Sequence, residues 1–160
     1  ALDGRLFEQQ VALAPNAQGV FHDGWVTLRA SPQCPCVFTR GLDLIPMPVR
    51  HGEGRFVTSD PTVLEQIEAR NLVALRYVDP ATGDPTDAYP HNPNGAVNAI
   101  AGVCDASGRV FGLMPHPEAY LTPWNHPHWA RQKINGVLPG EGLGLALFRN
   151  GVEFARCHVV

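Results

Sequence analysis

Residues 96–114 read AVNAIAGVCDASGRVFGLM, two apolar segments separated by a polar turn. Residues 96–104 and 109–114 have the apolar, β-branched composition that is typical of strands. The tetrapeptide Asp105-Ala106-Ser107-Gly108 between them consists of residue types that favour tight turns. The stretch therefore predicts a β-hairpin, and with it a sheet that contains at least one antiparallel pair of strands.

Four further segments have the composition of strands. Prolines lie within or beside two of them, which favours positions at the edge or the end of a sheet, because proline has no N–H group to donate. The predicted strands are residues 20–28, 37–39, 47–50 and 72–78. Loops rich in turn-forming residues are predicted at residues 79–95 and 115–142.

Two helices are predicted. Asp60 is a suitable N-cap, Pro61 suits the first helical position, and the apolar residues Val63, Leu64, Ile67 and Leu72 recur near helical spacing. Residues 143–158 predict a C-terminal amphipathic helix, whose apolar positions at i, i+3, i+7 and i+10 are Leu145, Phe148, Val152 and Ala155. The chain as a whole is therefore predicted to be mixed α/β.

The composition restricts the class of protein. The 160 residues fit one domain, and 44% of them are hydrophobic, which is typical of a globular chain. The net charge is −3 and the only lysine is Lys133, so nothing indicates a nucleic-acid partner. The apolar runs are too short for a membrane span, and no signal peptide opens the chain. The four cysteines form no C-x-x-C motif, so we expect free thiols in a cytoplasmic protein.

The segment GLMPHPE at residues 112–118 carries the clearest chemical signal. An apolar strand is followed by His116, and Glu118 lies two residues further on. Residues i and i+2 of an extended backbone point to the same side, and Pro117 stiffens the link between them. A carboxylate beside a histidine can fix one imidazole tautomer and stabilise the imidazolium, as in a nucleophile–base–orienter triad. From spacing alone, such a segment at the end of a strand is more often just a polar loop.

Two other motifs combine glycine, proline and polar residues. In HGEGRF (residues 51–56), Gly52 and Gly54 flank Glu53, so the backbone can turn sharply and present N–H groups to a ligand. A tight turn between strands with solvated charges is the simpler interpretation. In YPHNPNG (residues 89–95), prolines and Asn-Gly indicate a rigid loop.

Taken together, these motifs resemble a known family. The stretches HGEGRF (51–56), YPHNPNGAVNAIAGV (89–103) and GRVFGLMPHPE (108–118) are similar, in this order and spacing, to the class I glutamine amidotransferase component of phosphoribosylformylglycinamidine synthase. CVFTRGL (36–42) and NHPHW (125–129) add to the resemblance.

This resemblance implies a fold and a function. The implied fold is the three-layer, flavodoxin-like α/β fold of class I amidotransferases, present here in its C-terminal part with mixed and antiparallel strands. His116 would be the general base of a Cys-His-Glu triad and Glu118 its orienter, while the backbone at His51, Gly52 and Glu53 would hold glutamine. Ammonia would pass to a synthase subunit or domain of the same complex, which uses ATP and Mg in purine biosynthesis. The resemblance implies no cofactor and no metal in this chain.

The sequence departs from the family pattern at the nucleophile. Residues 1–160 contain no G-x-C-x-G elbow, so we expect a single partial domain that lacks this upstream segment and is inactive alone. Cys104 lies in a similar context, but a turn and a returning strand follow it, which would place it roughly 20 Å from His116. An incomplete sheet should also leave an edge uncovered, and we expect self-association there.

Two alternatives stay open. The chain could be a non-catalytic partner-binding fragment or a degenerate amidotransferase. It could instead be a metal-binding domain that uses His126 and His128 together with Glu118 or a cysteine, although zinc needs three or four converging ligands.

Overall fold

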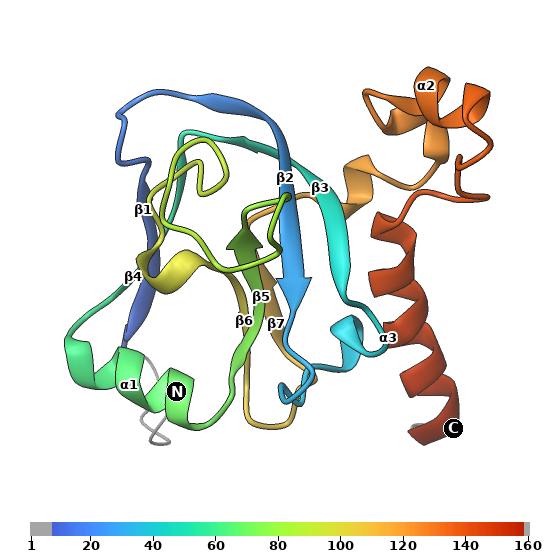
Figure 1. The fold of residues 1–160 in the computed structure, drawn as a ribbon. Coiled ribbons are helices and arrows are strands. Elements are labelled where there is room, and N and C mark those ends of the chain that lie inside the picture. Colours follow the sequence, from blue (N-terminus) through green and yellow to red (C-terminus); the bar gives the residue numbers. More distant parts are fainter. Residues whose placement is uncertain (1–7, 159–160) are drawn as a thin grey trace.

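Strands, α-helices and short 3₁₀ turns make up the regular structure in residues 8–158, the part of the chain that the computed structural model describes (Figure 1). The strands are β1 (Val11–Pro15), β2 (His22–Ala30), β3 (Leu44–His51), β4 (Glu53–Thr58), β5 (Val73–Val78), β6 (Ile100–Cys104) and β7 (Phe111–Leu113). The α-helices are α1 (Pro61–Ala69), α2 (Trp129–Ile134) and α3 (Gly144–His158). The 3₁₀ turns are η1 (Val37–Thr39), η2 (Val97–Ala99), η3 (Pro117–Ala119) and η4 (Pro123–Asn125).

The strands form two antiparallel sheets. Five strands pair in the order β3-β2-β5-β6-β7, and β1 pairs with β4 in a second, two-stranded sheet. The predicted hairpin is confirmed, because β6 and β7 pair with Cys104 opposite Phe111. A mixed α/β architecture with antiparallel strands is likewise what the sequence predicted. Neither β3 nor β7 has a further strand beside it within residues 8–158, and the expected self-association at a sheet edge stays a prediction.

The edge position of β3 explains why it can contain prolines. Pro46 and Pro48 lie opposite Thr27 and Trp25 of β2. No strand within residues 8–158 pairs with the other side of β3, so the N–H groups that proline lacks are not needed there. The Pro48 carbonyl remains available as an acceptor, and the backbone N–H of His116 donates to it at 2.8 Å. The edge strand thus holds the start of the segment 116–118.

Three sequence-based predictions differ from the structure. Residues 37–39 form the 3₁₀ turn η1 and not a strand, because Val37 donates its N–H to the Gly108 carbonyl and lies beyond the sheet ladder. Helix α3 turns a different face inward: Phe148 and Val152 are 45% and 50% exposed, and Leu147 is buried instead. The predicted loop 115–142 contains the short helix α2.

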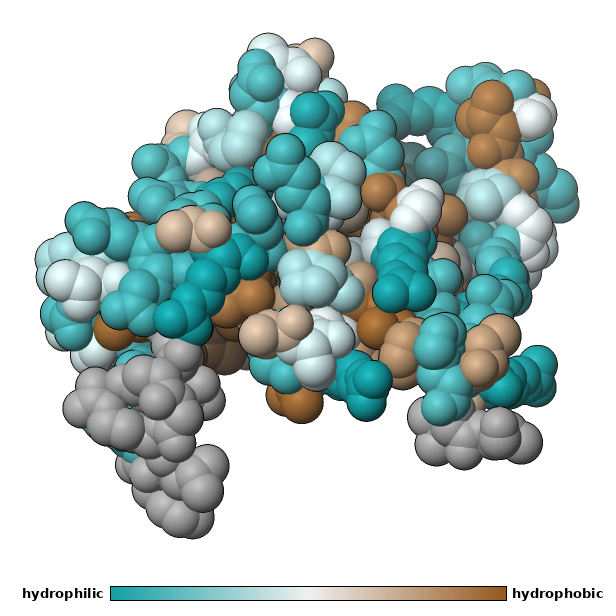
Figure 2. All heavy atoms as spheres, turned by 90° about the horizontal axis from the view of Figure 1, so that it is seen from below, coloured by the Kyte–Doolittle hydropathy of each residue, from teal (hydrophilic) through white to brown (hydrophobic). Residues whose placement is uncertain are grey.

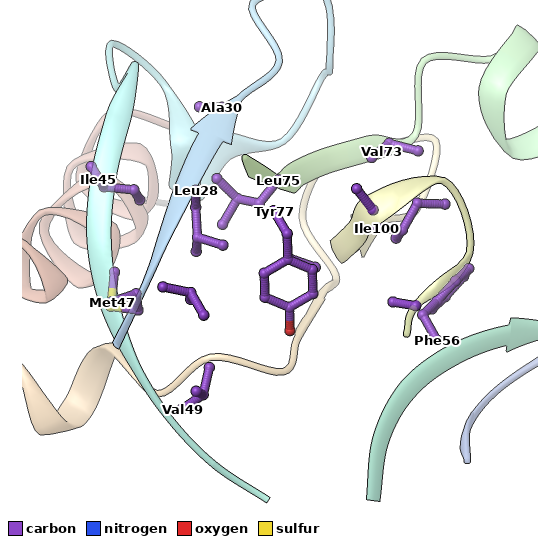
Figure 3. Close-up of a cluster of buried hydrophobic side chains, with 14 of the residues drawn as sticks. Leu28, Ala30, Ile45, Met47, Val49, Phe56, Val73, Leu75, Tyr77 and Ile100 are labelled. Carbon is purple, nitrogen blue, oxygen red and sulfur yellow. The ribbon is translucent and has the colours of Figure 1, made fainter. Parts of the chain in front are cut away.

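The core lies between the large sheet and the segments that cover it. Tyr77 of β5 is completely buried and points into a cluster of apolar side chains from neighbouring strands (Figure 3). Its hydroxyl accepts a hydrogen bond from the Asn94 side chain at 3.0 Å, so its polar group has a partner. The labelled members of this cluster are Leu28, Ala30, Ile45, Met47, Val49, Phe56, Val73, Leu75 and Ile100.

Helix α1 begins as the sequence predicted. The Asp60 carboxylate accepts from the backbone N–H groups of Thr62 and Val63, and Pro61 occupies the first turn. These contacts satisfy donors that have no partner inside the helix. The helix buries Val63 and Ile67 and is followed directly by the central strand β5.

The surface is mainly polar where it can be seen from below. In that view, brown apolar patches are separated by hydrophilic residues (Figure 2). Within residues 8–158, no helix combines the length and the apolar character that a membrane span needs.

We expect the core around Tyr77 to dominate stability. Leu28 is fully buried and lies opposite Ile45 and Tyr77, so Leu28→Ala should lower the free energy of unfolding by about 2–5 kcal/mol through lost burial and a residual cavity. Urea denaturation measures this change. Val110→Ala, at a position that is 69% exposed, is the matched control and should stay within about 0.5 kcal/mol. Equal effects of the two variants would contradict the assignment of this core.

Candidate functional site

His116 and Glu118 form a direct pair just after β7. The Nδ1 atom of His116 lies 2.6 Å from Oε1 of Glu118, and because a carboxylate only accepts, Nδ1–H is the donor. The backbone between them is the 3₁₀ turn η3, in which Pro117 takes the first position, and not the extended segment that the sequence argument assumed. The turn nevertheless brings the two side chains together, as predicted.

The second imidazole nitrogen of His116 is left available. Nε2 has almost no solvent-accessible surface and makes no hydrogen bond to any other described residue. Because Nδ1 holds the proton toward Glu118, Nε2 of the neutral ring carries a lone pair that can accept a proton. The arrangement is that of a general base whose orientation is fixed by a carboxylate.

The surroundings keep Glu118 ionised. Partial burial works to raise the pKa of Glu118, but the hydrogen bond from His116, a backbone N–H and the charges of His116 and Arg50 outweigh it, so the pKa is lowered. Arg50 belongs to the edge strand β3, whose carbonyl at Pro48 also holds the His116 backbone. An ionised carboxylate here stabilises the imidazolium that forms when Nε2 takes up a proton.

A cavity of about 380 Å³ lies beside the pair. Its volume is in the range of small-molecule sites, and its walls are mostly apolar, with His116 and Glu118 as the titratable groups. Phe38 and Phe111 stack at 5.7 Å between ring centroids and contribute one wall. No pattern in the sequence predicts this wall, because the two rings come from segments more than 70 residues apart. The remaining lining residues are Leu113, Met114, Pro115, Pro117, Leu147 and Phe148.

Glycines allow α3 to approach the turn η3 closely. A Cβ atom on Gly144 would lie 2.1 Å from the Pro117 carbonyl oxygen and 2.8 Å from that of Tyr120. The Gly144 N–H also donates to the Tyr120 carbonyl at 3.0 Å. The start of α3 therefore fixes the backbone on which Glu118 is placed.

The HGEGRF segment joins β3 to β4 and contains both buried and exposed residues. His51 is buried, and its Nδ1–H donates to the Asn16 side-chain oxygen at 2.8 Å. Burial lowers the pKa of His51, and the charges of His22 and His116 act in the same direction. Gly52 and Glu53 are exposed. None of His51, Gly52 and Glu53 lines the cavity beside His116, so their predicted role in binding glutamine stays a prediction.

The loop of residues 89–95 contacts the turn at residues 51–54 and supports it. Asn94 is fully buried, and its side-chain amide donates to the Gly54 carbonyl at 2.8 Å. Tyr89 contacts His22 edge-on, with ring centroids 5.9 Å apart. The motif that the sequence identified only as a rigid loop therefore braces the HGEGRF turn.

The cysteines lie away from the cavity. Cys34, Cys36 and Cys104 form a separate cluster with Ala74, and Cys157 is exposed on α3. None of the four lines the cavity next to His116.

The histidines of the loop 115–142 are engaged in aromatic packing. His126 lies 4.9 Å from Trp25 and 5.8 Å from Tyr120 between ring centroids. Burial lowers the pKa of His126, and the charges of His128 and Arg131 add to the effect. Residues 8–158 contain no group of three or more His, Cys, Asp or Glu side chains placed to hold a metal ion.

Comparison with known proteins identifies similar chains. Residues 1–155 match the CobB/CobQ-like glutamine amidotransferase domain. The phosphoribosylformylglycinamidine synthase subunit PurQ of Dehalococcoides mccartyi is 38% identical over 148 residues, which are 92% of this chain and 54% of that protein. The human phosphoribosylformylglycinamidine synthase is 40% identical over 120 residues, which are 74% of this chain and 9% of that protein.

A solved structure is similar in fold. A chain of PurLQS from Thermotoga maritima superposes with a TM-score of 0.60 at 28% sequence identity, covering 93% of this chain and 54% of that one. The architecture is therefore consistent with an incomplete class I glutamine amidotransferase fold. The chain spans about half the length of the PurQ subunits that it matches.

The hydrogen bond to Glu118 should determine the tautomer of His116. At a pH where the ring is neutral, long-range ¹H–¹⁵N spectra should place the proton on Nδ1. Glu118→Ala removes the acceptor, so the Nε2–H tautomer should become substantially populated. Glu141→Ala, which removes a surface partner of Arg149 instead, is the control and should leave the spectrum of His116 unchanged. An unaltered tautomer in Glu118→Ala would contradict the role of this contact.

Gly144→Ala should disturb the turn that places Glu118. The added methyl group meets backbone oxygens and not a flexible side chain, so we expect a loss of about 1–3 kcal/mol in unfolding free energy and shifted His116 resonances. Gly140→Ala is the matched control, because nothing lies within 4 Å of its Cβ position. Urea denaturation and ¹H–¹³C spectra of the imidazole measure both effects. Unshifted His116 resonances in Gly144→Ala would show that α3 does not position the turn.

Proposed function

This chain belongs to the CobB/CobQ-like glutamine amidotransferase domain family, and we propose that it supplies the base and the orienting carboxylate of a glutaminase site. The proposed site serves a phosphoribosylformylglycinamidine synthase in purine biosynthesis, as the names of the similar proteins suggest. The observation that supports the proposal best is the His116–Glu118 pair, which lines a cavity large enough for an amino acid and leaves Nε2 of His116 without a hydrogen-bond partner among the described residues.

The proposed chemistry is acyl transfer from the side-chain amide of glutamine. A cysteine thiol gives its proton to Nε2 of His116 as its sulfur attacks the amide carbon. The imidazolium then returns the proton to the leaving nitrogen, which departs as ammonia, and a second cycle of proton transfer lets water release glutamate. Glu118 holds the ring in the correct tautomer and stabilises its positive charge.

We propose that the nucleophile is not one of the four cysteines of this chain. A nucleophile must reach its base within about 3 Å, and no cysteine lines the cavity at His116. Cys104 forms part of a buried sulfur cluster, and burial raises its pKa, which disfavours the reactive thiolate. The chain alone is therefore proposed to be inactive.

The turn at residues 51–54 is the proposed contact for glutamine. Gly52 and Glu53 are exposed, so their backbone can face a ligand. Buried His51 holds the turn in place through its hydrogen bond to Asn16. The ammonia acceptor, ATP and Mg are proposed to bind to the synthase partner, since the proton transfers assigned to this chain need no cofactor.

A chimaera tests the proposed roles. Residues 1–160 would replace the matching segment of the Dehalococcoides mccartyi subunit, and glutaminase activity would be measured as ammonia release. His116→Ala in this chimaera should lower kcat by at least about 1,000-fold, because the residues of a triad act as a unit. Glu118→Gln should lower it by at least about 10-fold. Cys34→Ser, Cys36→Ser, Cys104→Ser and Cys157→Ser are the controls and should each retain activity.

The isolated chain gives the complementary result. Incubated with glutamine and, separately, with a glutamine analogue that alkylates amidotransferase nucleophiles, it should release no ammonia and show no adduct by intact mass. A stoichiometric adduct on one of the four cysteines, together with ammonia release, would overturn the proposal about the nucleophile. An active chimaera that tolerates His116→Ala would overturn the role of the base.

A further inference from the structure

Three cysteines gather on the opposite side of the Phe38–Phe111 wall from the cavity. Cys36, Cys104 and Ala74 form a small buried cluster, against which Cys34, Phe38 and Phe111 pack. The assigned chemistry uses none of these thiols. We propose that Cys34 and Cys104 are a site of reversible covalent modification, in which oxidation by a small disulfide such as glutathione disulfide joins them in an intramolecular disulfide.

The geometry selects this pair of thiols. The sulfur atoms of Cys34 and Cys104 are already in contact at 3.4 Å. They must approach by roughly 1.3 Å to reach the usual disulfide bond length of about 2.05 Å. Cys36 makes no sulfur contact of this kind within residues 8–158, and its side chain instead bonds to Thr39. Cys36 is therefore a neighbour of the pair and not a member of it.

The backbone holds the two thiols on segments that already pack together. Cys34 lies in a loop that begins at Ser31, whose N–H donates to the Ala74 carbonyl at 3.1 Å. Cys104 ends β6, and its N–H donates to the Leu72 carbonyl at 2.9 Å. Both segments are thus fixed near the N-terminal end of β5, so the bond requires side-chain adjustment and little movement of the chain.

The hairpin turn adds a second point of contact. Gly108 has a positive φ of 69°, and a Cβ atom there would lie 2.1 Å from the Pro35 carbonyl oxygen. The Gly108 carbonyl accepts from the N–H of Val37 at 2.9 Å. The cysteine loop is therefore in contact with the hairpin turn at Pro35 and Val37, the two residues that flank Cys36.

The reaction proceeds in two exchange steps. Cys34 is partly exposed, so its thiolate attacks one sulfur of glutathione disulfide and releases one glutathione thiolate. The Cys104 sulfur then attacks the Cys34 sulfur, and its proton passes to the departing second glutathione, which leaves as a thiol. The two protein thiols are oxidised to one disulfide, glutathione disulfide is reduced to two thiols, and excess glutathione reverses both steps.

The bond would tie the wall of the cavity to the sheet. Phe38 follows Cys34 by four residues, and Phe111 lies opposite Cys104 in the hairpin. The ring of Phe38 also lies 2.8 Å from the position of a Cβ on Gly151 of α3. Oxidation would therefore restrict the segment that separates α3 from the hairpin, and this consequence holds whether or not the cavity binds glutamine.

Thiol counting after equilibration tests the proposal. The 160-residue chain is incubated at fixed ratios of glutathione disulfide to glutathione, quenched with acid, denatured and alkylated with N-ethylmaleimide. At excess glutathione disulfide, we expect a Cys34–Cys104 cross-linked peptide and an alkylated Cys36, while the exposed Cys157 takes up one glutathione as a mixed disulfide. Excess glutathione should restore all four thiols.

Variants distinguish this pair from the neighbouring thiol. Cys104→Ser should trap a glutathione adduct on Cys34 in addition to the adduct on the exposed Cys157, and Cys34→Ser should form no disulfide and carry the Cys157 adduct alone. Cys36→Ser is the matched control and should form the disulfide as the unmodified chain does. A cross-link through Cys36, or four free thiols in the unmodified chain at excess glutathione disulfide, would overturn the proposal without reliance on any variant.

Two physical readouts show that the bond forms in the folded protein. The closed loop is long, because the two cysteines are 70 positions apart in the chain, so oxidation should raise Tm by about 5 °C or more. Hydrogen exchange at the Val37 amide, which donates to Gly108, should slow on oxidation. Unchanged Tm and exchange in a fully oxidised sample would contradict a disulfide that fits the native structure.

Discussion

The rest of the structure depends on the hydrogen bonds of the buried Asn94 side chain, because they connect separate parts of the molecule. Its amide N–H groups donate to the Gly54 carbonyl and the Tyr77 hydroxyl, and its oxygen accepts from the Ala96 N–H. Its backbone carbonyl accepts from Ala17. The loss of such partners costs more free energy for a buried polar group than for one at the surface. The Asn94 amide is therefore satisfied in one arrangement of its neighbours. One residue thus joins the core strand β5, the turn after β3 and the loop that precedes β6.

The same constraint explains how distant motifs meet. Gly54 closes the turn that begins at His51, and β3, which leads into this turn, accepts the His116 N–H through Pro48. His51 is close enough to His116 for the positive charge of His116 to lower the pKa of His51. The three motifs of the sequence therefore lie around one end of the large sheet. None of these links joins residues that are close in the chain, so each depends on the completed core.

The elements that the sequence predicted are those that local chemistry determines. The β6–β7 hairpin follows from its turn, and α1 follows from Asp60 and Pro61, because caps and turns act within a few residues. The predictions that differ from the structure concern segments whose conformation depends on tertiary contacts. Residues 37–39 have strand composition but lie where no strand can pair with them, and α3 turns a glycine-containing face inward because η1 and η3 approach it closely. The His116–Glu118 pair was predictable from a spacing of two, whereas the aromatic wall of its cavity was not.

The local origin of the His116–Glu118 pair also explains how base and nucleophile can come from different segments. One 3₁₀ turn, one edge-strand carbonyl and the start of α3 place the imidazole, and none of these contacts involves a cysteine. The Nδ1 proton is fixed by Glu118 and the lone pair of Nε2 stays free, so the base is oriented before any nucleophile is brought to it. In a preorganised site of this kind, the entropy of orienting the base is already lost when the domain folds. In the proposed reaction, the catalytic step then requires only that a thiol be placed within reach of one atom.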